Sequence, residues 1–380
     1  MKTVVVEGWR FIPHSYAVVN QYQCLELLRR PDIKLYHRDV PYFRKSWTPT
    51  NNTLTAEHEA LIRSMPEPPA DLRPDAYLRM GFPHKFENEP GAARTFTWMT
   101  SEFKRLQEDS IASGKKPWEA LSKAQATVIA CSRWAGVGIT NSGLPKSKLV
   151  VIPCGVDTSV FRPLPAEERA ALRKELGWEH RFVVINISAA THNKGLDLAM
   201  RAVTEMVPQK PEILICLKGS DTLYSSDANV VGSYQMLSQD EKERLRSHFY
   251  YTGDSMPAHR IAQWYQAADL YISPYRAEGF NLPVLEAAAC GLPVICTRGG
   301  STEDFVDDSW CLKIDSKEHQ DSKIGWMLEP KYAHLVELTR RAITEGAWRA
   351  SASAAAAAWV RDGFTWKHSV DKLLNLMFPG

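Results

Sequence analysis

Short apolar runs alternate along this chain with segments in which apolar residues recur at helical spacing. Residues 16–28 show the helical pattern, because Val19, Tyr22 and Leu25 fall on one face of a helix. This alternation predicts an α/β fold with parallel sheets. The predicted strands are 2–6, 33–37, 77–80, 95–100, 127–131, 149–153, 182–187, 213–217, 268–273 and 294–297. The predicted helices are 16–28, 165–176, 259–267, 351–358 and a last helix ending at Met377. Residues 44–72, rich in Pro, Asn and Thr, are predicted to be mostly loop.

The segment 273–297 is the most informative part of the chain. Pro283 suits the first position of a helix, where a missing N–H costs nothing, and the stretch from Gly291 to Pro293 ends that helix before a short apolar strand. The first turn then offers free N–H groups and the positive end of a helix dipole to an anion. Glu286 is predicted in this turn, pointing back toward the anion, where it accepts hydrogen bonds from neighbouring hydroxyls. A site for an anion beside two neighbouring hydroxyls suits a nucleotide, which carries both a phosphate and a ribose diol.

Glu278 and Glu286 lie within E-G-F-x-L-P-x-x-E-A-x-A-x-G-x-P-V-I. This string resembles the signature of the family-4 retaining glycosyltransferases of GT-B fold. The resemblance implies that Glu286 holds the ribose hydroxyls of a sugar nucleotide and that Glu278 contacts the donor sugar. The alternative is a buried helix with two solvated glutamates. The resemblance further implies that the sugar and diphosphate are lined by the backbone of Gly279, Phe280, Asn281 and Leu282.

A second string, V-I-P-C-G-V-D-T-S-V-F-R-P at residues 151–163, resembles the family's V-I-P-N-G-V-D-x-x-x-F-x-P, with Cys154 in place of the usual Asn. In the family this string leads from the first domain into the linker. The resemblance implies a GT-B architecture, in which two Rossmann-like domains face each other across a cleft and the C-terminal helix crosses back to the first. We expect an acceptor-binding domain at 1–165 together with 365–380, and a sugar-nucleotide-binding domain at 166–364.

The family commonly shows G-R-x-x-x-x-K-G after the first strand of its second domain, where the lysine neutralises the leaving diphosphate. Lys194, followed by Gly195, matches that lysine, but Ser188 and Ala189 stand where the arginine is expected. A leaving diphosphate needs charge compensation, so Lys218 is our candidate for a second cation. Either lysine is alternatively an ordinary surface residue. No D-x-D motif occurs, so a metal-independent enzyme is expected.

The nucleobase is expected against the turn that precedes the predicted helix 259–267. By the resemblance, Ser255 and Met256 contact it through main-chain groups, so their side chains do not select a base. The donor is therefore expected to be a UDP- or GDP-sugar, acting as a co-substrate, with no cofactor.

The acceptor residues of the first domain are harder to identify. His14 and Ser15 precede the first helix and either cap it or contact the acceptor. Relatives often carry a histidine at the end of a strand in mid-domain, but the matching strand here ends in Thr100 and has none. His84 is a nearby candidate, although a lone histidine is more often structural.

Composition excludes several classes of protein. The chain of 380 residues suits two domains, and 44% hydrophobic with 24% charged residues is ordinary for a soluble globular protein. No apolar run is long enough to span a membrane, and the N-terminus is unlike a signal peptide. The seven cysteines are scattered without zinc-site spacing, which suits reduced thiols in the cytoplasm.

Charge divides unevenly between the halves. Residues 1–165 hold 22 Lys/Arg against 16 Asp/Glu, and the remainder holds 24 against 28. A basic first half suits an anionic acceptor or peripheral contact with an anionic membrane, and the alternative is a merely solvated surface. We expect no nucleic-acid partner. The cations of interest, which flank an aromatic residue, are Lys104, Arg105, Lys115 and Lys116, with Trp118 beside them.

The resemblance therefore implies a retaining hexosyl- or related glycosyltransferase of EC 2.4 type, acting in glycan or glycolipid biosynthesis. It would transfer a sugar to a hydroxyl of a saccharide or lipid-linked acceptor, in the cytoplasm or at the inner face of the membrane. The alternatives are a non-catalytic sugar-nucleotide-binding relative and a GT-B epimerase or hydrolase. A dehydrogenase is disfavoured, because no G-x-G-x-x-G follows an early strand.

Overall fold

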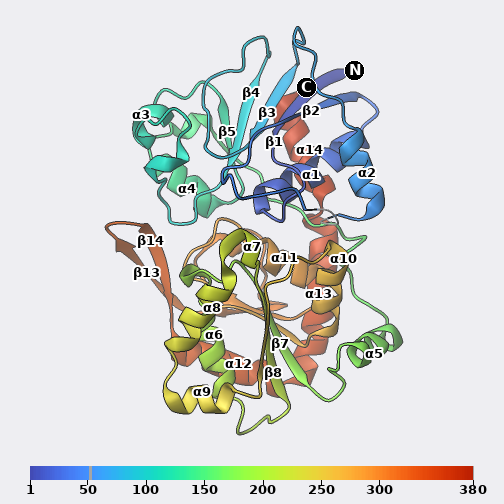
Figure 1. Ribbon diagram of the computed structural model, residues 1–380, viewed down its shortest axis with the longest axis vertical. Coiled ribbons are helices and arrows are strands. Elements are labelled where there is room, and N and C mark those ends of the chain that lie inside the picture. Colours follow the sequence, from blue (N-terminus) through green and yellow to red (C-terminus); the bar gives the residue numbers. More distant parts are fainter. Residues whose placement is uncertain (51–53, 380) are drawn as a thin grey trace. The chain divides into compact units, whose positions relative to one another are not determined.

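The computed structural model describes residues 1–50 and 54–379, in which helices and strands alternate as the sequence predicts (Figure 1). The chain forms two compact units. The first comprises Met1–Asp157, Ser322–Gly325 and Phe364–Gly380, and the second comprises Thr158–Asp321 and Trp326–Gly363. Against the predicted domains, 1–165 with 365–380 and 166–364, the structure assigns residues 158–165 to the second unit and residues 322–325 and 364 to the first.

The first unit is built on a six-stranded sheet with strand order β2-β1-β3-β4-β5-β6. Neighbouring strands of this sheet pair in parallel, and β1, next to the edge strand β2, pairs with β3 on its other side. The strands are β1 (Lys2–Gly8), β2 (Ile33–Asp39), β3 (Ala76–Met80), β4 (Thr95–Met99), β5 (Thr127–Ala130) and β6 (Leu149–Val151).

The last helix of the chain packs in this first unit. α14 (Trp366–Met377) contacts α1 (Ser15–Leu28), and the Trp366 and Tyr22 rings stack with centroids 5.6 Å apart. Its start is fixed by Thr365, whose side chain accepts from the His368 amide as a helix cap.

The described residues of the segment 44–72 are mostly loop, as predicted, but the segment also contains one helix that the sequence did not reveal. It contains α2 (Ala56–Ser64), which is capped by Thr55 and buries only His58 and Ile62, so its apolar face is too sparse to be recognised in the sequence. Residues 51–53 of that prediction lie outside the described residues. The other helices of the unit are η1 (Glu108–Ser110), α3 (Pro117–Leu121), α4 (Arg133–Asn141) and η2 (Lys146–Lys148).

The second unit holds another six-stranded sheet, with order β12-β11-β10-β7-β8-β9. Its neighbouring strands also pair in parallel, so the carboxyl ends of these strands share one edge. The strands are β7 (Phe182–Ile187), β8 (Ile213–Lys218), β9 (Phe249–Thr252), β10 (Leu270–Ser273), β11 (Val294–Thr297) and β12 (Cys311–Ile314).

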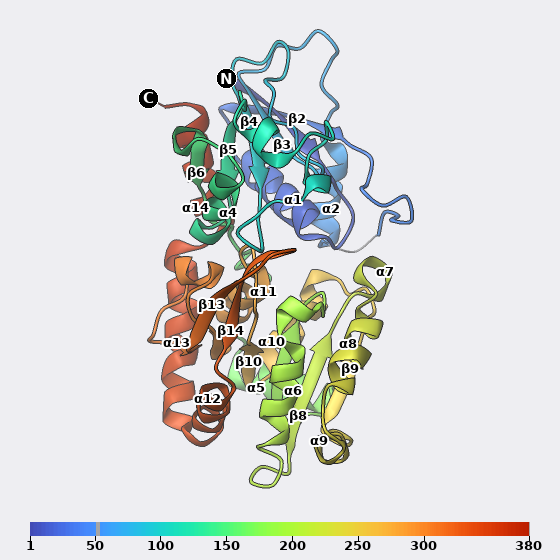
Figure 2. The same ribbon diagram turned by 90° about the vertical axis from the view of Figure 1, so that its left-hand side faces the viewer.

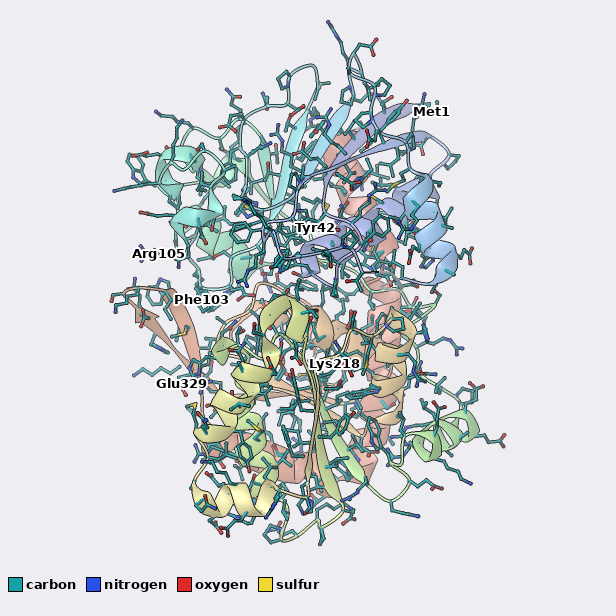
Figure 3. The ribbon with its side chains drawn as sticks, viewed as in Figure 1. Met1, Tyr42, Phe103, Arg105, Lys218 and Glu329 are labelled. Atoms are coloured by element: carbon teal, nitrogen blue, oxygen red, sulfur yellow. The ribbon has the colours of Figure 1, made fainter. Side chains whose placement is uncertain are left out.

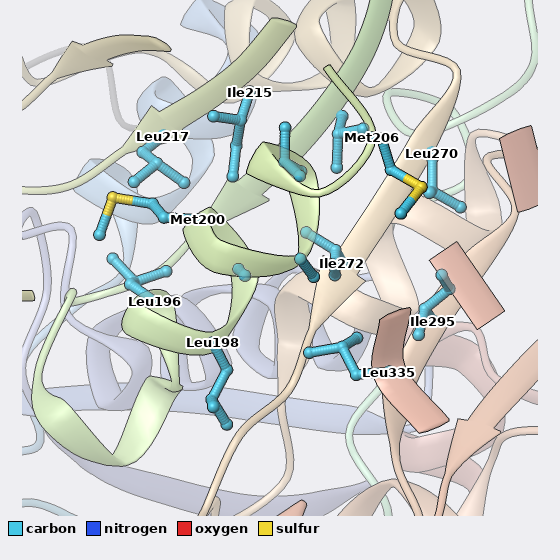
Figure 4. Packing of buried hydrophobic residues seen from close by; sticks show 14 of the residues in the cluster. Leu196, Leu198, Met200, Met206, Ile215, Leu217, Leu270, Ile272, Ile295 and Leu335 are labelled. Carbon is cyan, nitrogen blue, oxygen red and sulfur yellow. The ribbon is translucent and has the colours of Figure 1, made fainter. Parts of the chain in front are cut away.

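Helices of the second unit pack in two groups. α6 (Leu196–Thr204) lies between α12 (Tyr332–Thr344) and α8 (Ser226–Gln235), and contacts β8 and β10 (Figure 2). Apolar side chains from α6, α12 and the strands fill the space beneath, including Leu196, Ile272 and Leu335 (Figure 4). The second group consists of α10 (Ala258–Ala267), α11 (Leu282–Ala289) and α13 (Gly346–Gly363). The remaining helices are α5 (Ala166–Glu175), η3 (His192–Lys194), α7 (Asp221–Tyr224), α9 (Gln239–Leu245) and η4 (Ser301–Asp304). Strands β13 (Ser316–Asp321) and β14 (Gly325–Pro330) form a separate two-stranded sheet.

All seven cysteines are buried free thiols. In the part of the chain that the structure describes, no helix is both long and apolar enough to cross a lipid bilayer.

Leu335 offers a test of the second unit's core. Leu335 lies on α12, and its side chain, with 0% exposure, packs in the core beside the sheet and α6. Leu335→Ala should therefore lower the free energy of unfolding by about 2–5 kcal/mol. Glu337→Ala, at an exposed site on the same helix, should change it by no more than about 0.5 kcal/mol. Urea unfolding followed by circular dichroism measures both, and equal midpoints for the two variants would contradict the packing described here.

Candidate functional site

The sequence-predicted donor residues gather at the carboxyl edge of the second sheet. Lys194 follows β7, Lys218 ends β8, the Ser255–Met256 turn follows β9, and Glu278 follows β10. In open α/β sheets this edge is where ligands bind.

The loop after β10 leads into α11 through a residue in the left-handed conformation. Asn281 has φ 76° and its side-chain amide donates to Ser273 Oγ at 3.1 Å. Asparagine tolerates this conformation better than most residues that carry a side chain. The helix then begins at Leu282, with Pro283 as its second residue rather than its first.

Glu286 is the fifth residue of α11, so the prediction that it lies in the first turn is wrong by one position. The helix begins one residue earlier, at Leu282, directly after Asn281 in the left-handed conformation. The carboxylate of Glu286 accepts a hydrogen bond from the Tyr265 hydroxyl at 3.1 Å. Burial raises the pKa of Glu286 to about 7, against the opposing effect of the Tyr265 hydrogen bond. A carboxyl group with this pKa changes charge near neutral pH.

Lys194 and Glu278 form an ion pair with Nζ to Oε1 at 3.0 Å, and their side chains are 10% and 12% exposed. The two loops can meet because residue 195 has no side chain. Gly195 has φ 71°, and a Cβ there would overlap the carbonyl oxygen of Pro274.

Asn193 holds the same two loops together. Its carbonyl oxygen accepts from the Arg276 amide at 2.7 Å, and its side-chain amide donates to Ala277 O at 2.9 Å. Both bonds lie within one or two residues of the Lys194–Glu278 pair, so they restrict how far those side chains can separate.

Lys218 is buried at the end of β8 (Figure 3), where its ammonium group donates to Gly219 O at 2.6 Å. Burial lowers the pKa of Lys218, while the charges of Asp221 and Asp254 act in the opposite direction. Lys218 therefore lies at the carboxyl edge of the second sheet, the edge at which a second cation for the diphosphate is expected.

Ser255 is exposed and Met256 is half-buried in the turn after β9. This turn is fixed against β8 by main-chain bonds, from Gly219 N to Thr252 O at 2.8 Å and from Asp221 N to Gly253 O at 3.1 Å. A side chain at Gly253 would overlap the Asp221 carboxylate, which would then have to move.

In the first unit, His14 is the N-cap of α1, and its Nδ1 accepts from the Tyr16 amide at 3.2 Å, whereas Ser15 is exposed. Burial lowers the pKa of His14 to about 4, so the ring is neutral at pH 7. A neutral ring that accepts at Nδ1 carries its proton on Nε2.

His84 lies close to the same helix. Its Nε2 is 3.4 Å from the Tyr16 hydroxyl, which also accepts from the Thr100 amide at 3.3 Å. Burial lowers the pKa of His84 to about 4. The structure thus brings His14, His84 and the end of β4 together around Tyr16, at the carboxyl edge of the first sheet.

The cations expected to meet an anionic surface differ in their surroundings. Lys115 and Lys116 are exposed, and Trp118 beside them is 60% exposed. Arg105 is also exposed (Figure 3), but the ammonium of Lys104 lies 4.0 Å from the centre of the Trp134 ring.

Sequence reasoning missed three residues that shape these sites. Tyr265 hydrogen-bonds Glu286, Tyr16 joins the two histidines, and Asp197 pairs with Arg276. For the two tyrosines, the available signal was a polar group on the buried face of a predicted helix. Within residues 1–50 and 54–379, no group of three or more His, Cys, Asp or Glu side chains is placed to hold a metal ion.

Comparison with known proteins relates the chain to the glycosyltransferases. Residues 168–349 match the profile of the family described as Glycosyl transferases group 1. The chain is 30% identical over 213 residues to D-inositol 3-phosphate glycosyltransferase of Acidothermus cellulolyticus, covering 53% of this chain and 44% of that protein. It is 27% identical over 241 residues to GDP-mannose-dependent alpha-(1-6)-phosphatidylinositol monomannoside mannosyltransferase of Mycolicibacterium smegmatis, covering 61% and 57%.

The alignments thus span about half the length of these curated relatives. Among solved structures, Anabaena HepE in complex with UDP and glucose superposes with a TM-score of 0.71 at 14% identity, covering 99% of both chains. At that identity the likeness concerns the fold. The match to the glycosyl transferases group 1 family extends over residues 168–349, and the fold of the chain is that of the GT-B glycosyltransferases.

Proposed function

We propose that this member of a glycosyltransferase family transfers a sugar from a nucleotide-sugar donor to a hydroxyl of a saccharide or lipid-linked acceptor, with retention at the anomeric carbon. The observation that carries the proposal is the Lys194–Glu278 ion pair at the edge of the sheet that also presents Glu286 and α11. A cation for the diphosphate and a carboxylate for the sugar lie side by side.

In the proposed reaction, the bond from the anomeric carbon to the diphosphate oxygen breaks and a bond to the acceptor oxygen forms on the same face. The acceptor proton passes to the departing phosphate oxygen, so no protein nucleophile is required. Lys194 stabilises the charge that grows on the diphosphate, which lowers the barrier because this interaction is strongest in the transition state. Glu278 accepts hydrogen bonds from the donor sugar, and Glu286 from the ribose.

The nucleotide is proposed to be UDP or GDP. The name of the mycolicibacterial relative specifies GDP-mannose, and HepE was solved with UDP. The turn at Ser255 and Met256 is proposed to contact the base through its main chain. We further propose that the reaction needs no metal ion, since the chain lacks a D-x-D motif, and that it takes place in the cytoplasm.

A second candidate is a non-catalytic sugar-nucleotide-binding protein. It is favoured by one observation, namely that Ser188 and Ala189 stand where relatives carry the diphosphate arginine. Binding alone therefore does not separate the two candidates.

The proposed function is tested first by donor screening. UDP, GDP, UDP-glucose and GDP-mannose are added separately in thermal unfolding experiments, and a nucleotide at a hundred times its dissociation constant should stabilise the protein by about 2.7 kcal/mol. Release of nucleoside diphosphate that depends on added saccharide or lipid-linked acceptors supports the transferase. Binding without release under any acceptor supports the non-catalytic candidate, and release that needs no acceptor supports a hydrolase.

Glu286 should make nucleotide binding depend on pH. Only its ionised form accepts two ribose hydroxyls, and its pKa is about 7 in the free protein. Binding should therefore tighten as pH rises from 6 to 8, with the dissociation constant for UDP or GDP falling up to about tenfold per unit below pH 7. Titration calorimetry in buffers of different ionisation enthalpy should also detect proton release.

Glu286→Gln should flatten this profile and weaken binding by roughly 1.5–3 kcal/mol, because the ribose loses a charged acceptor. Glu337→Gln, at an exposed position on α12, serves as the matched control. A profile that survives in Glu286→Gln would assign the titration to another group.

Lys194→Ala should reduce turnover by about 10²-fold or more and weaken donor binding much less, because the charge that it stabilises grows during bond cleavage. Lys218→Ala should have a smaller effect of the same kind if Lys218 supplies the second cation. Steady-state kinetics with and without a chelator measure both points. An unchanged Lys218→Ala enzyme rejects that role, and activity that disappears with chelator and returns with a divalent ion rejects the metal-independent reaction.

A further inference from the structure

Arg276 and Asp197 form a buried, bidentate ion pair inside the second unit. Nη1 donates to Oδ1 and Nη2 donates to Oδ2, both at 2.8 Å, and the residues are only 6% and 4% exposed. The guanidinium holds the pKa of Asp197 below its usual range despite the opposing effect of burial. Both groups are therefore charged at neutral pH.

Arg276 bonds the loop that carries Lys194 at two points, one on each side of that lysine. Besides Asp197, Nη1 donates to the carbonyl oxygen of His192 at 3.1 Å. One guanidinium thus holds the chain two residues before Lys194 and three residues after it. The planar fork of arginine suits this task, because its donors have fixed directions.

The same residue belongs to the loop that carries Glu278. Arg276 lies two positions before that glutamate, and its own amide donates to Asn193 O at 2.7 Å. Any movement of the guanidinium away from Asp197 would change the separation of the loops, and hence the distance of 3.0 Å between Lys194 and Glu278.

Arg276 is also fixed from its other side. Its carbonyl oxygen accepts from the Leu328 amide at 2.7 Å, and its Nε lies 3.6 Å from Glu329 Oε2 (Figure 3). Both partners belong to β14. The side chain of Arg276 therefore lies between two carboxylates, those of Asp197 and Glu329, and its backbone carbonyl is fixed by β14.

Stability alone is a weak reason for such an arrangement. Two charges taken out of water lose hydration that their attraction repays only in good geometry, and apolar replacements of buried pairs are often as stable. What an apolar pair would not supply here is a rigid connection between two loops.

We propose that Arg276 and Asp197 are positioning residues for the donor site, which set the separation of Lys194 and Glu278. The pair acts through those two side chains and does not touch the substrate. Its effect on turnover rests on the proposed function, whereas its effect on the position of Lys194 does not.

The structural part is tested without any ligand, by labelling lysines with acetic anhydride and quantifying each site by mass spectrometry. In Arg276→Gln, Lys194 should react about tenfold faster than in the wild type, because the loop opens more often. Lys218, buried at the end of β8, should keep its rate and serves as the internal reference. Arg201→Gln is the matched control, because Arg201 lies on α6, as Asp197 does, and pairs with Glu241 at 3.0 Å. This substitution should leave the labelling rate of Lys194 unchanged.

Arg276→Lys keeps the positive charge beside Asp197, so it should fold even if Arg276→Gln does not. A lysine cannot hold both Asp197 and His192 in the same geometry, so Lys194 should still react faster. Wild-type labelling of Lys194 in a folded Arg276→Lys or Arg276→Gln protein overturns the proposal.

The functional part uses UDP and GDP for binding and UDP-glucose and GDP-mannose for turnover. Misplaced reacting groups can cost about 100-fold, so kcat should fall by about that factor in Arg276→Gln while the dissociation constant of the bound nucleotide changes less than about threefold. The double variant Asp197→Asn/Arg276→Gln should be no slower than Arg276→Gln, because the residues act as one unit. Additive losses, or equal losses in kcat and affinity, overturn the positioning role. A wild-type protein that turns over neither donor counts against the proposed function, and the labelling result then still decides the position of Lys194.

Discussion

The close approach of two loops, one after β7 and one after β10, is the constraint on which the candidate donor site depends. These strands pair in parallel, so both loops leave the same edge of the sheet. They come together only because residue 195 is a glycine, since a Cβ would overlap the carbonyl oxygen of Pro274. Asn193 and the Arg276–Asp197 pair then hold the contact, and the Lys194–Glu278 ion pair is its chemical result.

The sequence predicted the parts of this arrangement that depend on local pattern. Strand β7 has the predicted bounds, Phe182–Ile187, because a short apolar run has few alternatives. The segment that carries Glu278 and Glu286 was located by spacing and by its proline and glycines. The helix start was missed by one residue because an asparagine in the left-handed conformation has no distinct sequence pattern. α2 was missed because a helix that buries two residues has almost no apolar periodicity.

Contacts between distant residues could not be predicted in this way. Arg276 and Asp197 are 79 positions apart, and Tyr265 and Glu286 are 21 apart. They meet because of the strand order, which places β10 beside β7 and packs α10 against α11. In the first unit, likewise, His84 reaches Tyr16 across 68 positions. The resemblance to a family indicated which residues carry chemistry, but only the fold shows which residues hold them.

The ion pair between Lys194 and Glu278 also determines what a diphosphate meets as it approaches. The pair joins opposite unit charges at 3.0 Å, so beyond a few ångströms its field is that of a dipole and falls off faster than the field of a lone lysine. Long-range electrostatic steering by Lys194 is correspondingly weak, and the attraction of this cation is confined to short range. Under the proposed function, Lys194 therefore contributes more to selecting a donor that is already bound than to attracting one from solution.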